Sequence, residues 1–181
     1  MKRANRARTK NKTVLAFWLV PARPERDLFA ELIRILAVEL KAPRFEPHLT
    51  ICSGPDTKTV RAALKTIMNE AVRLRVRGLS ASGDYTKSLF IRFTATSALD
   101  DLNRQLRRAA KLPVRPLRNP HVSLLYANVP LSSEKELART IHLPFREVIF
   151  DSIKVVRCNS STKTPADVRG WRVLATKKLT R

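Results

Sequence analysis

The most constraining feature of this sequence is a short pattern that occurs twice. Residues 46–51 read EPHLTI, and residues 119–124 read NPHVSL. Each copy has a proline, a histidine, an apolar residue, a hydroxyl residue and a second apolar residue. In an extended strand, side chains two positions apart point to the same face, and the residues between them point to the other. Each copy therefore predicts a strand with a histidine and a hydroxyl on one face and apolar side chains on the other.

The polar faces of these two strands carry a matched set of groups. His48 lies two residues before Thr50, and His121 lies two residues before Ser123. If the two strands face each other across a cleft, they provide two imidazoles for proton transfer and two hydroxyls that can donate hydrogen bonds to one small anion. Such a set of groups can open a phosphodiester without a metal.

The hydrophobic pattern around the motifs alternates between strands and amphipathic helices. Helices are expected at residues 24–40, from Asp56 or Thr57 to about residue 71, at 97–110 with Ser97 as the cap, and from Ser132 or Ser133 to about residue 142. Besides the first histidine strand, strands are expected at residues 13–20, 72–79, 88–94, 120–127, 146–157 and 171–176. The sequence therefore predicts one α+β domain over residues 13–181. Its two similar lobes would each hold a small antiparallel sheet with helices outside, and the histidine strands would meet at a central cleft.

The chain is strongly basic. Its 181 residues include 36 Lys and Arg against 15 Asp and Glu, which gives a net charge of +21. Residues 1–12 hold six of the basic side chains and lack hydrophobic periodicity. We expect them to form a flexible arm that is either solvated or in contact with nucleic acid. The charge of the remaining chain would attract polyanions and speed the association of negatively charged substrates, although a generally basic composition explains it equally well.

The two cysteines and the hydropathy argue against a zinc-binding, a membrane-spanning or a secreted protein. Cys52 and Cys158 do not form a zinc-binding spacing. Strand alternation would place Cys52 on the face of His48 and Thr50, where a structural role is favoured over a redox or nucleophilic one. No apolar run is long enough to span a bilayer, and no signal-peptide segment follows the basic N-terminus. We expect a cytoplasmic monomer that does not bind membranes.

Three stretches resemble a known superfamily. The motifs FEPHLT at residues 45–50 and HVSLLY at residues 121–126 resemble those of the 2H phosphoesterases. They look most like the cyclic phosphodiesterase branch, which acts on 2′,3′-cyclic nucleotides and ADP-ribose cyclic phosphate. The segment FWLVP at residues 17–21 also matches the opening of that branch, and the resemblance covers roughly residues 14–176. It implies a two-lobed fold, no metal or other cofactor, and a reaction in which water opens a cyclic phosphate to a monoester.

The resemblance and the strand geometry together give the motif residues roles. His48 and His121 would be the catalytic pair, and we assign His121 as the base and His48 as the acid, although the symmetry of the motifs allows either order. Thr50 and Ser123 would donate hydrogen bonds to the non-bridging phosphate oxygens, where charge builds up in the transition state.

Two aromatic residues are assigned to substrate binding by the resemblance alone. Trp18 matches an aromatic residue that lies beside the substrate base, and the alternative for it is a core tryptophan. Tyr126 matches a tyrosine that reaches the phosphate. Strand alternation places Tyr126 opposite His121 and Ser123, so it can contribute only if the strand ends or bulges at Leu125.

Three functions follow from these observations. The first is hydrolysis of the cyclic phosphate of a small nucleotide. The second is the action of a related 2H enzyme on RNA ends, as an RNA 2′,3′-cyclic phosphodiesterase or in the manner of a 2′,5′-ligase, and the basic surface and arm favour RNA as a partner. The third is a non-catalytic module that binds nucleotides or RNA and holds phosphate without turnover.

Overall fold

The computed structural model describes residues 12–67 and 70–180, so nearly all of the predicted basic arm lies outside the described residues. The strands are β1 (Thr13–Pro21), β2 (Leu49–Pro55), β3 (Val72–Ser80), β4 (Leu89–Phe93), β5 (His121–Leu125), β6 (Glu147–Asn159) and β7 (Arg172–Lys178). The α-helices are α1 (Glu25–Glu39), α2 (Lys58–Ala62), α3 (Ser97–Ala109), α4 (Leu131–Thr140) and α5 (Pro165–Arg169). Short 3₁₀ turns, η1 and η2, cover Ala63–Lys65 and Tyr85–Lys87.

The strands form one antiparallel sheet in the order β2-β1-β6-β3-β4-β5, with β7 added to β6. The predicted α+β class is therefore confirmed, and the two expected sheets turn out to be two halves of a continuous one. Strand β3 joins the halves, because Val72–Arg75 pair with β6 and Val76–Ser80 pair with β4. The register shifts between Val76 and Gly78, and Gly78 has a φ of 114° that favours glycine.

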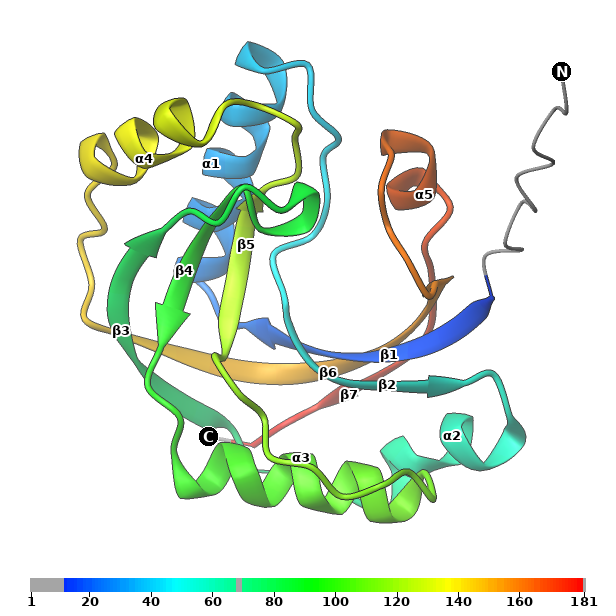
Figure 1. Cartoon of the computed structure of the whole chain (residues 1–181). Coiled ribbons are helices and arrows are strands. Elements are labelled where there is room, and N and C mark those ends of the chain that lie inside the picture. Colours follow the sequence, from blue (N-terminus) through cyan, green and yellow to red (C-terminus); the bar gives the residue numbers. More distant parts are fainter. Residues whose placement is uncertain (1–11, 68–69, 181) are drawn as a thin grey trace, which may run out of the picture.

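The curvature of this sheet brings its two ends together. The edge strands β2 and β5, which carry the two histidine motifs, contact each other although they stand at opposite ends of the strand order. In Figure 1, β3, β4 and β5 stand upright on the left, whereas β1, β2, β6 and β7 run across the centre. In this view helix α1 runs behind β4 and β5, α4 lies above the strands and α3 lies beneath them. The motifs thus meet where the two halves of the sheet face each other.

The buried face of the sheet and the helices share one hydrophobic core. Helix α1 buries Phe29, Ile33 and Leu36, whose spacing of three or four residues keeps them on one face. The apolar partners of the motif histidines, Leu49 and Val122, are both fully buried in the same core. Burying the apolar face of each motif strand therefore fixes which face its polar residues occupy.

Two helix predictions need correction. The second helix begins after its Thr57 cap, whose Oγ1 accepts from the Val60 N–H at 3.2 Å, but it ends in the 3₁₀ turn at Lys65 and does not reach residue 71. The cap of α3 is Thr96 and not Ser97, because Thr96 Oγ1 accepts from the Leu99 N–H at 3.3 Å.

Helix α5 lies in a segment expected to be an irregular polar loop. It begins with a capping box, in which Thr164 and Asp167 each accept a hydrogen bond from the backbone N–H of the other. At only five residues, α5 is too short to show hydrophobic periodicity in the sequence.

Candidate active site

His48 is held by its own motif. It lies directly before β2 and is 6% exposed. Its Nδ1 lies 2.6 Å from the backbone oxygen of Glu46, two residues upstream. A carbonyl oxygen can only accept a hydrogen bond, so Nδ1 must carry the proton and donate. This hydrogen bond fixes the tautomer of the neutral ring and leaves Nε2 free to take part in proton transfer.

His121 repeats this arrangement at the start of β5. Its Nδ1 donates to the backbone oxygen of Asn119 at 2.9 Å, again two residues upstream. Asn119 has a φ of 53°, in the left-handed region that asparagine tolerates better than most residues. The residue before each motif proline therefore supplies the acceptor for the ring two positions later. Both rings are oriented in the same way, and their Nε2 atoms are both available.

The two imidazoles are electrostatically coupled. Burial lowers the pKa of His48 to about 4, against the raising effect of its hydrogen bond to Glu46, and the charge of His121 lowers it further. Burial also lowers the pKa of His121, its hydrogen bond to Asn119 opposes this, and the nearby charge of Lys87 adds to the lowering. Both rings are therefore neutral in the free protein at pH 7, and the charge of His121 disfavours a proton on His48.

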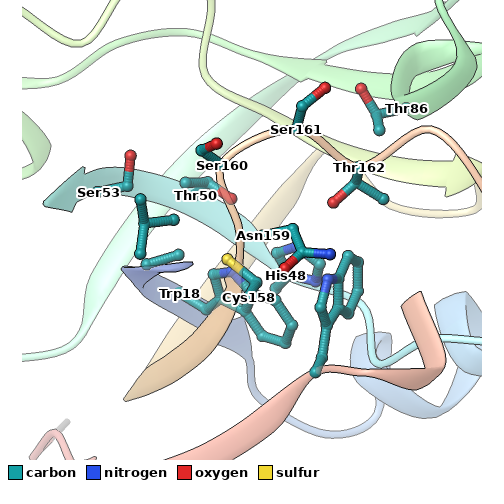
Figure 2. A pocket seen from close by; sticks show the side chains of 13 residues that line it. Trp18, His48, Thr50, Ser53, Thr86, Cys158, Asn159, Ser160, Ser161 and Thr162 are labelled. Atoms are coloured by element: carbon teal, nitrogen blue, oxygen red, sulfur yellow. The ribbon is translucent and has the colours of Figure 1, made fainter. Parts of the chain in front are cut away.

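A cavity of about 380 Å³ opens beside His48 (Figure 2). Thr50 lines this cavity with His48, as strand alternation predicts, and its side chain is exposed. Much of the remaining wall consists of hydroxyl residues that the sequence analysis did not identify, namely Ser53, Thr86, Ser160, Ser161 and Thr162. None of the residues that line the cavity is charged at neutral pH.

A second cavity of about 330 Å³ lies on the side of His121. The two imidazoles thus line two neighbouring cavities and not a single one. The cavities adjoin at η2, where Thr86 lines the first and the next residue, Lys87, lines the second. The motif strands β2 and β5 contact each other, β5 also contacts η2, and the charge of His121 acts on His48.

Sequence comparison agrees with this geometry. The family described as cyclic phosphodiesterase-like protein matches residues 14–179, which include every element from β1 to β7. The chain belongs to this family. Membership places it among the 2H phosphoesterases, which act on phosphodiesters and cyclic phosphates, and confirms the resemblance carried by the two histidine motifs. No curated protein matches the chain by sequence.

Solved structures of 2H phosphoesterases share the fold of the family. E. coli LigT complexed with ATP is 14% identical, with a TM-score of 0.57 over 94% of this chain and 99% of that chain. E. coli LigT complexed with 3′-AMP is 13% identical, with a TM-score of 0.55 over 93% and 99%. A further structure described as a phosphoesterase is 16% identical, with a TM-score of 0.54 over 94% and 99%. At these identities the likeness shows the fold alone.

The other motif hydroxyl, Ser123, is more enclosed than Thr50. Ser123 is buried, and its Oγ donates to the backbone oxygen of Thr86 at 2.8 Å. To donate to a phosphate, this hydroxyl would have to turn away from Thr86. Among the described residues, the Thr50 hydroxyl has no hydrogen-bond partner, so it can donate without any such change. The roles of Thr50 and Ser123 as phosphate donors stay predictions.

Tyr126 directly follows β5, which ends at Leu125, and it is buried and lines neither cavity. The alternation that would have turned Tyr126 away from Ser123 stops there, and the Ser123 side chain acts to lower the pKa of the Tyr126 hydroxyl. The ring of Tyr126 stacks on Phe45 at 4.1 Å, and burial raises the pKa of its hydroxyl. Tyr126 therefore adjoins the predicted phosphate donor, while its contact with substrate stays a prediction.

Trp18 lies under the His48 ring. The two rings are stacked with centroids 3.7 Å apart and planes 13° apart, and Trp171 packs edge-on against Trp18 at 4.9 Å. Trp18 is 4% exposed and lines the first cavity. One ring face of Trp18 is covered by His48, and this contact contributes to the burial of the imidazole. A direct contact with the substrate base stays a prediction.

The predicted position of Cys52 is wrong. Phe17 pairs with Cys52 and the next residue, Trp18, pairs with Thr50. Ile51 is therefore an extra residue in a β-bulge. The bulge turns Cys52 into the core, and the next side chain on the cavity face is Ser53. Cys158 from β6 is the cysteine that lines the first cavity. Burial raises the pKa of both thiols to about 11, so both stay protonated near neutral pH.

In residues 12–67 and 70–180, no three or more His, Cys, Asp and Glu side chains are grouped so that they could hold a metal ion. No helix in this part of the chain has the length and apolarity needed to cross a membrane.

Replacing Asp167 should loosen one wall of the first cavity. Its carboxylate accepts from Asn159 Nδ2 at 2.9 Å and from the backbone N–H groups of Lys163 and Thr164 at 3.0 Å, so it ties down both ends of the hydroxyl loop at residues 160–162. We expect Asp167→Ala to lower the free energy of unfolding by about 1 kcal/mol, as loss of a helix cap does. Urea denaturation measures this change.

The control for this prediction is Asp101→Ala. Asp101 forms a surface ion pair with Arg104 at 2.9 Å within α3, and such pairs contribute about 0.5 kcal/mol or less. Equal losses of stability in the two variants would show that Asp167 acts only as a surface charge.

Proposed function

We propose that this protein hydrolyses a cyclic phosphate to a phosphomonoester by acid–base catalysis from His48 and His121, without a metal. The substrate class is a 2′,3′-cyclic nucleotide or ADP-ribose 1″,2″-cyclic phosphate. The observation that carries the proposal is the matched orientation of the two rings. Each donates through Nδ1 to a carbonyl two residues upstream, which leaves its Nε2 for proton transfer, and the charge of His121 acts on His48.

The proposed reaction needs two proton transfers. A water oxygen attacks phosphorus and gives its proton to the neutral imidazole. The bond from phosphorus to one ribose oxygen breaks, and the protonated imidazole gives its proton to that oxygen. The strained five-membered ring makes phosphorus electrophilic, and each proton-transfer group contributes about 10²–10⁴ in rate. Hydrogen bonds from Thr50 and Ser123 to the non-bridging oxygens would stabilise the charge that develops there.

The electrostatics of the site favour a particular division of these roles. A base must be neutral, and His48 carries the large shift, with its pKa lowered to about 4. The acid must be protonated, and His121 is the less buried ring beside the second cavity, where a bound anion would raise its pKa. We therefore propose His48 as the base and His121 as the acid. The motifs alone gave the opposite assignment, with His121 as the base and His48 as the acid.

We expect the purified protein to convert 2′,3′-cyclic AMP to an adenosine monophosphate in the presence of a chelator. Phosphorus NMR measures the turnover and identifies whether the 2′- or the 3′-phosphate forms. Complete dependence on an added metal would overturn the mechanism. Tight binding of the product with no turnover of the cyclic nucleotide would instead support a binding module.

A second candidate is a 2H enzyme that acts on RNA ends. The net charge of +21 favours it, because a mononucleotide hydrolase does not need so large a positive charge. A titration of oligonucleotide binding against salt tests this candidate, since each phosphate contact steepens the salt dependence.

A further inference from the structure

The cavity beside His121 has a different chemical character from the cavity beside His48. Three cationic side chains line it, namely Lys87, Arg92 and Arg118, and the ring of Phe90 forms part of the same wall. By contrast, the first cavity is lined by hydroxyl, aromatic and small side chains without a charge. His48 therefore lines an uncharged cavity and His121 a cationic one.

The position of Arg92 follows from the register of the sheet. Arg92 on β4 is directly opposite His121 on β5, and directly opposite residues of an antiparallel pair point to the same face. Phe90, two residues earlier on β4, also lies on this face and packs edge-on against the His121 ring at 5.4 Å. Arg92 thus belongs to the same surface as the reacting imidazole.

The cations of this cavity are largely unpaired. Within residues 12–67 and 70–180, neither Arg92 nor Arg118 forms an ion pair. Lys87 pairs with the exposed Asp84 at a distance of 3.7 Å, and its charge still acts on His121. Guanidinium groups without a carboxylate partner are suited to bind phosphate through two parallel hydrogen bonds.

We propose that this cavity binds a second phosphate of the substrate, carried on the 5′ oxygen of the ribose whose cyclic phosphate reacts. The inference rests on the proposed function. A ribose carries its base at one end of the ring and its 5′ oxygen at the other. With the cyclic phosphate between the two imidazoles, the base would enter the uncharged cavity and the 5′ phosphate would reach Lys87, Arg92 and Arg118.

The direct test compares two substrates that differ by one phosphate. These are adenosine 2′,3′-cyclic phosphate and its 5′-phosphorylated form. We expect kcat/KM for the 5′-phosphorylated form to be higher by at least about ten-fold, because charge-assisted hydrogen bonds to phosphate are the strong ones. The ratio of the two kcat/KM values should fall toward one in Arg92→Gln and Arg118→Gln.

The matched control is Arg108→Gln. Arg108 is an exposed arginine in the last turn of α3 and lines neither cavity, so its replacement should leave the ratio unchanged. A wild-type ratio near one would overturn the inference. A ratio that falls equally in all three variants would also overturn it, since that result shows only an effect of total charge.

Product binding separates this inference from the proposed function. Calorimetric titration with 2′-AMP and with adenosine 2′,5′-bisphosphate measures the effect of the 5′ phosphate without any turnover. Tighter binding of the bisphosphate that is lost in Arg92→Gln supports the subsite, even if no cyclic nucleotide is hydrolysed. Hydrolysis of 2′,3′-cyclic AMP with equal affinity for both products supports the proposed function and overturns the subsite.

Two further substrates identify the source of the second phosphate. A short RNA that ends in a 2′,3′-cyclic phosphate carries a phosphodiester on the 5′ oxygen, whereas ADP-ribose 1″,2″-cyclic phosphate carries a pyrophosphate there. We expect both to exceed adenosine 2′,3′-cyclic phosphate in kcat/KM, and the one with the larger arginine-dependent gain identifies the source. Failure of both to exceed the mononucleotide would overturn the inference.

Discussion

Replacing either motif histidine with alanine is expected to lower kcat for 2′,3′-cyclic AMP by about 10²–10⁴, which is the typical contribution of one proton-transfer group. His48→Ala removes the ring that stacks on Trp18, and His121→Ala removes the ring opposite Arg92. Initial rates followed by phosphorus NMR measure the loss, and circular dichroism verifies that each variant is folded. The control is His142→Ala, because this third histidine is exposed and lines neither active-site cavity.

The same two variants decide which histidine is the acid. A 4-nitrophenyl phosphodiester has a leaving group that departs without a proton, so the variant that lacks the acid should keep most of the wild-type rate on this substrate. The variant that lacks the base should lose rate on both substrates. With His48 as the base, rescue is expected in His121→Ala alone. Rescue in His48→Ala would restore the assignment made from the motifs, and full activity of either variant on 2′,3′-cyclic AMP would remove that residue from the chemistry.

The face of each motif residue could be predicted from sequence because burial decides it. Leu49 and Val122 enter the core, and the alternation of a strand then places Thr50 and Ser123 on the opposite face. This reasoning holds only as long as the strand stays regular. The bulge at Ile51 turned Cys52 into the core, and the end of β5 at Leu125 brought Tyr126 to Ser123. Neither irregularity has a glycine or proline to mark it in the sequence.

The cavity walls could not be predicted for a different reason. They are built from segments that are distant in sequence, such as Ser53 after the bulge and the hydroxyl loop at residues 160–162. The cationic cavity likewise joins Lys87, Arg92 and Arg118, which stand out little in a chain with 36 basic residues. Strand register and the curvature of the sheet bring these residues together, and neither can be read from periodicity.

Acid should destabilise this protein through His48. The ordinary pKa of histidine is 6.5, and burial lowers the pKa of His48 in the folded protein to about 4. Between these two values the unfolded chain binds more protons than the folded one, so stability falls as the pH falls. The loss begins below about pH 6.5 and is complete below about pH 4. A difference of about 2.5 pKa units corresponds to about 3 kcal/mol of unfolding free energy.

The effect of this one histidine can be isolated by comparing the wild type with His48→Asn across pH. Other groups also titrate in this range. The pKa values of Asp56 and Asp167 are lowered by hydrogen bonds to groups other than His48, so these two carboxylates contribute equally to both proteins. The difference in unfolding free energy between wild type and His48→Asn, measured by urea denaturation, should therefore shift by about 3 kcal/mol against the wild type from pH 7 to pH 4. His142→Asn supplies the baseline for removing an exposed histidine. If the difference in unfolding free energy from the wild type depends on pH in the same way for His48→Asn and His142→Asn, the folded protein does not hold His48 neutral. The argument for His48 as the base then fails.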